Sequence, residues 1–303
     1  MGRIKFTDYL PLNLVGVNSP SKTLVAEAVT GTPISTGAVP GESFYINKAQ
    51  ALQLSTPYFP VYPGWYREVM VDVGATAANI AFGTIGAQLS LTTSTLYDNQ
   101  VTDTTHALNI GIAPCVFLTG GLGLLVSGAS APIPVGGTVP GSLLAMTPGN
   151  YTIVQDAGDA SLLVAANQTI SVGNVLVSNA SNGTVSAAGA ISDTVYSTIV
   201  GIAEAALTVP AAASGTAVAA PSGGVAVYTV TLTGGASNGL AGLQAVVTAA
   251  SNAANNGTYL ITASTSTTIT LANPNAIAET HSSTVTPQGL VRARLGFPFG
   301  QAI

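Results

Sequence analysis

Residues 168–206, QTISVGNVLVSNASNGTVSAAGAISDTVYSTIVGIAEAA, are the stretch whose pattern decides the fold of this chain. Three β-branched residues lead toward the turn at Asn182-Gly183, and they are Val172, Val175 and Val177. Asn-Gly between apolar runs is the strongest short-range hairpin signal, because both residues tolerate positive φ. A third strand is expected over residues 197–203, and its partner is expected far along the chain at residues 290–297, LVRARLGF. The stretch therefore predicts a β body that the C-terminal segment completes.

The composition favours β structure throughout. Of 303 residues, 6% are charged, 47% are hydrophobic and 34 are glycine. Val and Thr favour the pleated surface of a strand and Gly favours turns, whereas the strong helix formers Glu, Lys and Arg are scarce. A chain of this length can bury a sizeable core in one or two domains. We therefore predict an all-β fold with a β-barrel or β-sandwich body.

Shifts in composition divide the chain into three parts. Residues 1–64 carry seven prolines and apolar residues without a steady period, which predicts an extended N-terminal arm. Residues 65–208 together with 288–303 form the predicted β body. Residues 209–287 begin with a small-residue linker and continue with alternating strand patterns and Asn-Gly turns. They predict a small inserted Ig-like β-sandwich.

Several local elements are predicted around this framework. A short helix is expected over residues 47–54, and strands are expected over 67–73, 79–82, 87–92, 107–112 and 115–126. The polar run at 97–105 predicts a loop, and the run QDAGDAS at 155–161 predicts the turn of another hairpin.

Five aromatic residues lie within the run TPYFPVYPGWY at residues 56–66, namely Tyr58, Phe59, Tyr62, Trp65 and Tyr66. Aromatic side chains are favoured in interface cores, so one interpretation is an anchor on a partner. The other is a lid over the protein's own core. The sequence leaves both open.

Basic residues are absent between positions 68 and 291. Nucleic-acid binding requires clustered cations that displace counterions from phosphates, so no nucleic-acid role is expected. Ordinary soluble proteins carry about a quarter charged residues, so this chain is expected to cover much of its surface with partners. Arg292 and Arg294 alternate on the last predicted strand. They are expected to pair with carboxylates at a surface or subunit contact, with anion binding as the alternative.

Neither export nor membrane insertion is expected. The longest apolar piece, residues 115–126, is too short for a spanning helix, and aromatic residues at 6% are too few for the girdles of an outer-membrane barrel. Asp8, Pro11 and Asn13 interrupt any signal-peptide core at the N-terminus. Cys115 is the single cysteine, which excludes an intrachain disulfide, and it is expected to be buried as a small hydrophobic residue.

No catalytic, cofactor or metal site is predicted. His106 and His281 are far apart in sequence and are expected in polar loops. Asp156 and Asp159 could lean toward a cation, but calcium loops need more oxygen ligands at tighter spacing, so a turn is favoured. No nucleophile elbow and no phosphate-binding loop with its lysine are present. We therefore expect a protein that is not an enzyme.

Two features of the sequence resemble proteins of tailed-bacteriophage particles. ISVGNVLVSNASNGTVS at 170–186, STIVGIAEAA at 197–206 and VRARLGF at 291–297 resemble the small β-barrels of capsid decoration, or cement, proteins. NNGTYLITASTSTTITLANPNAIAET at 255–280 is similar to a small β domain that recurs in phage virion proteins. The resemblance covers less than half of the chain.

The resemblance implies a structural virion protein that binds the outer surface of a phage head and stabilises the capsid lattice. Its implied partners are the major capsid protein and further copies of itself, as a homotrimer. Its implied location is the exterior of the head, after synthesis in the cytoplasm of the bacterial host. The alternative is a head fibre or tail-associated adhesion protein, in which the inserted domain binds host surface glycans.

Overall fold

A computed structural model describes residues 43–55, 60–72, 74–76, 82–88, 100–103, 114–117, 151–179, 181–189 and 199–295. Within these residues the chain is made of β-strands, two single-turn 3-10 helices and one short α-helix, α2 (Lys48–Leu54). The prediction of an all-β chain is confirmed, as is the predicted helix at 47–54. None of the described helices is long and apolar enough to cross a membrane.

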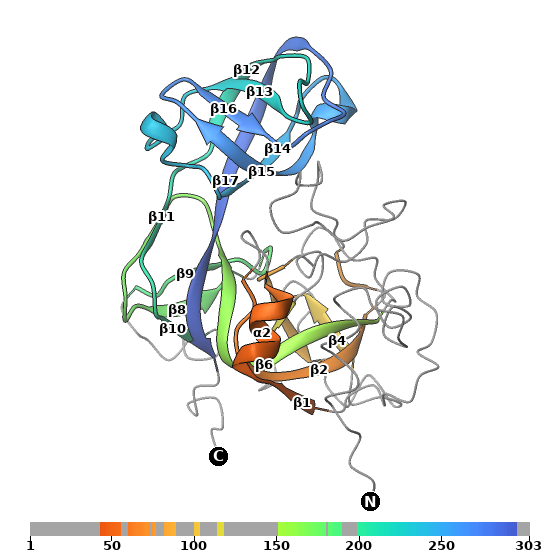
Figure 1. Cartoon of the computed structure of the whole chain (residues 1–303), viewed down its shortest axis with the longest axis vertical. Helices are drawn as coiled ribbons and strands as arrows, with labels where there is room; N and C mark the ends of the chain where they lie inside the picture. The colour runs from red at the N-terminus through yellow and green to blue at the C-terminus, as the bar shows by residue number, and fades with distance from the viewer. Residues whose placement is uncertain are drawn as a thin grey trace, which may run out of the picture.

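The strands pair into three rings that are linked by two long strands (Figure 1). In the first ring the order is β2 (Gly64–Val71), β4 (Gln100–Asp103), β3 (Ile85–Gln88), β5 (Pro114–Phe117) and β6 (Tyr151–Val164), and β6 pairs back with β2. In the second ring the order is β6, β9 (Val185–Ala187), β8 (Val175–Ser178), β10 (Ile199–Ala203) and β17 (Glu279–Leu295), and β17 pairs back with β6.

The third ring is a closed six-stranded barrel in which every pairing is antiparallel. Its order is β17, β12 (Ala213–Val218), β13 (Ala226–Val230), β16 (Thr268–Leu271), β15 (Gly257–Ser264) and β14 (Gln244–Thr248), and β14 pairs back with β17. The predicted alternation is confirmed on β13, where Ala226, Tyr228 and Val230 are buried and Val227 and Thr229 are exposed. The predicted sandwich thus takes a closed form in which both ends of the sheet meet on β17.

Separate hydrophobic clusters fill the second and third rings. The cluster of the third ring comprises Val218, Ala226, Tyr228, Val230, Leu232, Leu240, Ala245, Val247, Tyr259, Ile261, Ile269, Leu271, Ala276 and Val285. The cluster of the second ring includes Leu162, Val164, Leu176, Val185, Val200, Val291 and Leu295. A smaller cluster in the first ring includes Phe117, Val154 and Cys115, so the expected burial of this cysteine is confirmed.

β17 runs through two of these cores. Residues 279–288 pair with β12 and β14 of the third ring, and residues 289–295 pair with β6 and β10 of the second. The predicted partnership between the 197–203 strand and the C-terminal strand is confirmed by the pairs Gly201–Leu295 and Ala203–Ala293. The boundary falls at Gly289, where an added Cβ would lie 2.9 Å from Leu243 Cδ2 and 3.0 Å from Leu207 Cδ2. Side chains from both rings therefore pack over this glycine.

The hairpin predicted for QDAGDAS is wrong, because these residues lie inside the continuous strand β6. Gly158 has a φ of 101° and pairs with Gly64 on one side and Leu295 on the other. An added Cβ at Gly158 would lie 2.7 Å from the carbonyl oxygen of Pro63. The glycine thus marks the point where β6 changes partners from β2 to β17, and a bend of this kind uses the same residue types as a turn.

The Asn-Gly hairpin forms with different turn chemistry. β8 and β9 are antiparallel with Val177 opposite Ser186, as predicted. Gly183 has a φ of 69°, but Asn182 does not adopt a positive φ and instead accepts a hydrogen bond from the Thr184 amide through Oδ1. Val172 does not belong to this strand. It is exposed in the turn between β7 (Gln168–Ile170) and β8, and β7 pairs with β11 (Leu207–Val209) as a separate two-stranded sheet.

Part of the predicted N-terminal arm packs on the body. β1 (Ser43–Ile46) pairs with β2, and Ile46, Ala51 and Val61 are buried. Residues 1–42 lie outside the described residues, as do residues 107–112 of one predicted strand, 79–81 of the strand predicted at 79–82, and 118–126 of the segment predicted at 115–126. The predicted loop at 97–105 is wrong where it is described, because β4 lies there and pairs with both β2 and β3.

Candidate functional site

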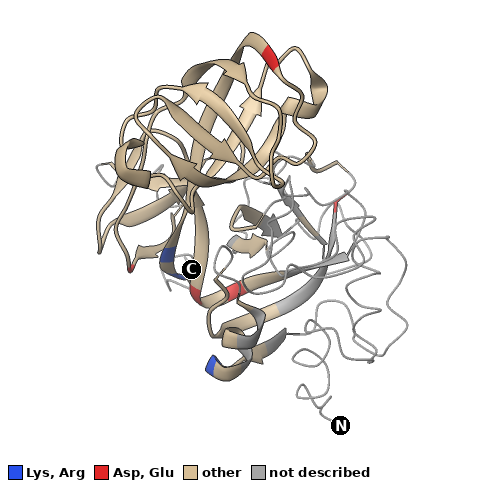
Figure 2. Cartoon of the chain, turned by 45° about the horizontal axis from the view of Figure 1, so that its top comes forward, with Lys and Arg blue, Asp and Glu red and all other residues tan. Residues whose placement is uncertain are grey.

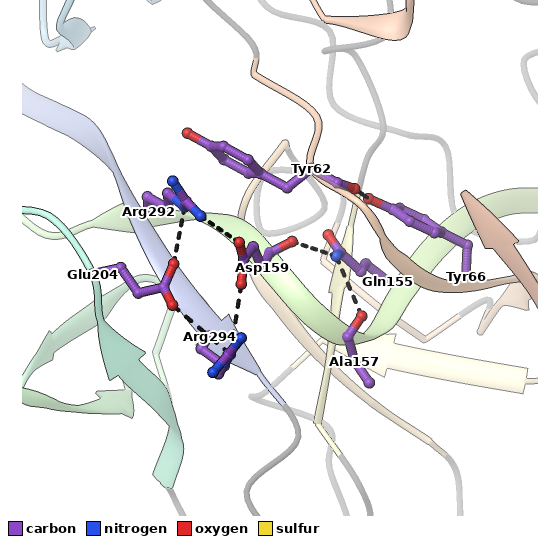
Figure 3. A network of polar contacts seen from close by, with 8 residues as sticks. All are labelled: Tyr62, Tyr66, Gln155, Ala157, Asp159, Glu204, Arg292 and Arg294. Carbon is purple, nitrogen blue, oxygen red and sulfur yellow. Dashed lines mark hydrogen bonds and ion pairs between the residues drawn. The ribbon is translucent and has the colours of Figure 1, made fainter. Parts of the chain in front are cut away.

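Four charged side chains from β6, β17 and the residue after β10 meet on the outside of the second ring (Figure 3). We call Asp159, Glu204, Arg292 and Arg294 the charge cluster. Asp159 lies on β6, Glu204 directly follows β10, and the two arginines project from the same face of β17. The register explains the meeting, because Arg294 lies opposite Asp159 in the β6–β17 ladder and opposite Ile202 in the β10–β17 ladder.

Arg292 makes the closest contacts in the charge cluster. Its Nη2 donates to Asp159 Oδ2, and its Nε lies 2.9 Å from Glu204 Oε2. The second contact has an ion-pair distance but not the direction of a hydrogen bond, since Glu204 Oε2 is buried without a hydrogen-bond partner. The hydrogen bond to Asp159 raises the pKa of Arg292, and burial acts in the opposite direction.

Arg294 is more exposed and more loosely held. Its Nε lies 3.7 Å from Asp159 Oδ1 and 3.8 Å from Glu204 Oε1, and 67% of its side chain is accessible. Two positive and two negative charges therefore balance within the charge cluster. The predicted pairing with carboxylates is confirmed, and an incoming anion would have to displace these carboxylates before it could bind the guanidinium groups.

An aromatic and amide shell surrounds the charge cluster. The guanidinium carbon of Arg292 lies 5.0 Å from the ring centroid of Tyr62, within the range of a cation–π contact. Burial raises the pKa of the Tyr62 hydroxyl, while the charge of Arg292 lowers it. Gln155 Nε2 donates to the carbonyl oxygen of Asp159 at 2.5 Å, and the Tyr66 hydroxyl donates to the carbonyl oxygen of Tyr62 at 2.5 Å. These contacts hold both partners of Arg292 in place.

A second polar cluster closes one end of the third ring. Asn255 is fully buried and donates through Nδ2 to Glu279 Oε1 at 2.7 Å and to the Ile277 carbonyl oxygen at 2.8 Å. Its Oδ1 accepts from the Ile277 amide, and Glu279 Oε2 accepts from the Asn252 amide. The carboxylate of Glu279 thus serves as an acceptor inside the barrel.

Two tyrosines, Tyr228 and Tyr259, complete this second polar cluster, which we call the plug. Tyr228 accepts a hydrogen bond from Asn273 Nδ2 at 2.9 Å, and the Tyr259 hydroxyl lies 2.9 Å from the carbonyl oxygen of Asn256 and 3.1 Å from that of Ala254. Burial raises the pKa of both tyrosines, that of Tyr259 to about 12. Hydrogen bonds thus connect both tyrosines with the loops that precede β15 and β17.

The other candidates from the sequence do not converge. In the described part of the chain, no group of three or more His, Cys, Asp and Glu side chains could hold a metal ion. Asp156 and Asp159 lie on β6, and Asp159 contacts the arginines. His281 was expected in a loop, but it is exposed on β17. His106 lies outside the described residues.

Sequence reasoning missed three members of these clusters. Glu204 is the only carboxylate in the run VGIAEAA, and it follows a strand that was predicted to pair with the arginine strand, so its partnership with Arg292 was open to prediction. Tyr62 could not be assigned to Arg292, because nothing in the sequence indicates that residues 60–66 cross β6. Asn255 stands in the Asn-rich run NAANNG, which by itself indicates only a turn.

Comparison with known proteins supplied no relative. No protein-family model, no curated protein and no solved structure matches this chain.

Proposed function

We propose that this chain is a structural virion protein that binds the outer surface of a phage head and stabilises the capsid lattice. The observation that carries the proposal is the distribution of charge. The third ring carries a single charged residue other than histidine, Glu279, and Figure 2 shows its surface almost free of Asp, Glu, Lys and Arg. Glu279 and the charge cluster are occupied by contacts within the chain.

A surface of this kind suits permanent burial in an assembly. The cores of protein interfaces are depleted of charge, because a charge that loses water without gaining a partner destabilises the complex. Apolar burial contributes about 25 cal/mol per Å2 before the costs of association, and many copies on one particle would add their contacts. The proposed partners are the major capsid protein and further copies of this chain, as a homotrimer. The resemblance of residues 170–186, 197–206 and 291–297 to decoration proteins agrees with this assignment.

The alternative, an adhesion protein of a head fibre or tail, is favoured by one observation. The third ring projects from the rest of the molecule (Figure 1), as a receptor-binding module would. Its two tyrosines, Tyr228 and Tyr259, are nevertheless both buried, so it offers no exposed Phe, Tyr or Trp ring on which a sugar could stack. The exposed aromatic pair is Tyr45 and Trp65 on β1 and β2, with ring centroids 5.5 Å apart. We therefore place the attachment surface on the body and its N-terminal side.

The test is decoration of heads that lack this protein. We expect the full chain to bind them and to raise the temperature at which they rupture. A variant that lacks residues 1–42 but keeps β1 and α2 should fold and bind weakly. This boundary matters, because removal of residues 1–55 would also remove Ile46 and Ala51 from the core.

Two outcomes separate the alternatives. Normal occupancy by the truncated chain would move the attachment surface onto the β body. Failure of the full chain to bind heads, together with binding of the full chain to host cells or purified host glycans, would overturn the proposal in favour of adhesion. Under the first assignment a variant without the third ring should still bind heads through the body and its N-terminal side, but with lower occupancy, because the uncharged surface of this ring is then missing from the assembly.

A further inference from the structure

The segment from Pro60 to Pro63, which we call the strap, crosses the outside of β6 before the chain enters β2 at Gly64. Ser161 Oγ on β6 donates to the carbonyl oxygen of Pro60 at 2.6 Å. The Val61 side chain is buried, and its amide donates to Ser55 Oγ at 2.9 Å. The strap is thus held at its start by α2 and β6, and at its end by the β1–β2 and β2–β6 ladders.

Between these two ends the strap reaches the C-terminal strand through one side chain. The ring of Tyr62 lies over the guanidinium group of Arg292 on β17 (Figure 3). Arg292 is at the same time bound to Asp159 and paired with Glu204, so its position is fixed from the other side. The contact therefore joins residues that are far apart in sequence and belong to different rings.

Arg294 provides an internal comparison. It projects from the same face of β17 two residues later and lies near the same two carboxylates. Among the described residues, however, the cation–π contact with the strap is made by Arg292 alone. Neutralising the carboxylates would require only the two positive charges, whereas holding the strap requires the guanidinium group of Arg292.

We propose that Arg292 is a latch that fastens the strap, and that the strap can lift from β17 while all three rings stay paired. The observations that carry this are the cation–π contact between Tyr62 and Arg292 at the middle of the strap and the β1–β2 and β2–β6 ladders beyond its end. Lifting would break this contact, expose Val61, and break the hydrogen bonds Ser161–Pro60, Val61–Ser55 and Tyr66–Tyr62, but no pairing of β2. Such a motion would change how the preceding N-terminal residues are presented to a partner without unfolding the body.

Hydrogen exchange of the full chain, followed by mass spectrometry, tests the latch at the amide of Val61. Arg292→Ala and Tyr62→Leu should each speed exchange of this amide about two- to five-fold, as expected for loss of an exposed cation–π contact. Arg294→Ala and Tyr62→Phe are the matched controls. Both keep the guanidinium group of Arg292 and the aromatic ring at position 62, so exchange of the Val61 amide should be unchanged. Exchange in β14 and β15 should be the same in all five proteins, including the unaltered chain.

Equal effects of Arg292→Ala and Arg294→Ala would overturn the proposal, since the cluster would then act only by charge balance. An unchanged Val61 amide in Tyr62→Leu would also overturn it. Faster exchange throughout the chain in Arg292→Ala would mean that this variant unfolds. Tyr62→Leu then decides whether the latch exists, because it leaves all four side chains of the charge cluster in place. The double variant should exchange no faster than the faster single variant, since both remove one contact.

Discussion

The third ring and the first ring are both closed by β pairing, but they are assembled in different ways. In the third ring, β12 to β16 follow one another along the chain, every pairing is antiparallel, and one cluster fills the interior. The first ring draws its strands from residues 64–164, includes the parallel pair β2–β4, and shares β6 with the second ring, just as the third ring shares β17. Ile85 and Val116 of the first ring, however, belong to the hydrophobic cluster of the second ring, so the first ring shares its core with a neighbour and the third ring does not.

This difference indicates which part of the molecule can fold without the rest. Local antiparallel contacts close small loops of chain, which lose little entropy, so the third ring should form by itself. The body, in contrast, depends on a strand that it shares with the third ring. It needs β17, and β17 begins in the third ring before it reaches the second.

Removal of the third ring tests whether the body folds without it, and this is the largest change to the molecule among these predictions. Replacing residues 211–287 with a short Gly/Ser loop should leave a folded body, because Val209 and Gly289 are in reach of each other at the boundary. Val209 and Pro210 must stay, since Val209 belongs to the core of the second ring and the Pro210 carbonyl accepts from the Asn167 amide. Cooperative melting, followed by the fluorescence of Trp65, the single tryptophan, is the measurement.

Its counterpart is the isolated segment 211–288, which should show β circular dichroism and a cooperative transition of its own. An insoluble body in the first experiment, or an unfolded barrel in the second, would show that the two share one folding unit.

The polar plug tests whether the closed end of the third ring is needed. Asn255→Ala should lower the free energy of unfolding by about 3 kcal/mol, because Asn255 is buried and its removal takes away three hydrogen bonds to the Ile277 backbone and the Glu279 carboxylate. Asn275→Ala is the matched control in the same region, since this side chain is exposed. Denaturant unfolding measures both, and equal stabilities would mean that water replaces the Asn255 contacts without cost.

The boundary between the two rings should be sensitive to added volume. Gly289→Val should cost about 2 kcal/mol, because its side chain would displace Leu207 and Leu243, which pack over the glycine from opposite rings. Gly189→Val is the control, as an added Cβ there meets nothing within 4 Å. Chemical denaturation again provides the measurement. A tolerated valine at 289 would indicate that the two rings are joined loosely.

Alkaline pH should weaken the third ring through Tyr259, the smallest of these effects. Burial raises the pKa of this hydroxyl from 10.0 to about 12 in the folded chain. The stabilisation is complete below pH 10 and is lost as the pH rises from 10 to 12, because the unfolded chain releases the proton first. The expected loss is about 1.5 kcal/mol, because solvent screening reduces the roughly 2.7 kcal/mol that the full rise in pKa would give.

The check is to compare Tyr259→Phe with the unaltered chain, since other tyrosines also titrate in this range. The stability difference between the two should shrink from pH 9 to pH 12, and the absorbance difference should show a hydroxyl that titrates near 12. A constant difference in stability across this range would contradict the assignment.

Although the run that predicted a linker instead contains β12, the sequence by itself determined the class of the fold, the alternation of β13, the strands β13 to β16 of the third ring, and the late return of the C-terminal strand to the 197–203 strand. It could do so because side chains alternate on every strand and the partners in the third ring follow closely along the chain. It also indicated that Arg292 and Arg294 pair with carboxylates, since alternation places both on one face.

Tertiary structure alone decided the rest. QDAGDAS carries the residues of a turn, yet Gly158 lies within a strand because β2 and β17 both pair with it. The polar run at 97–105 becomes a strand because β2 and β3 supply its ladders. Asp159, Glu204 and Tyr62 meet at Arg292 because the β6–β17 register and the path of the strap bring them together. Local propensity cannot indicate such distant partners, because ladder hydrogen bonds and burial stabilise a strand only after residues that are far apart in sequence have come together.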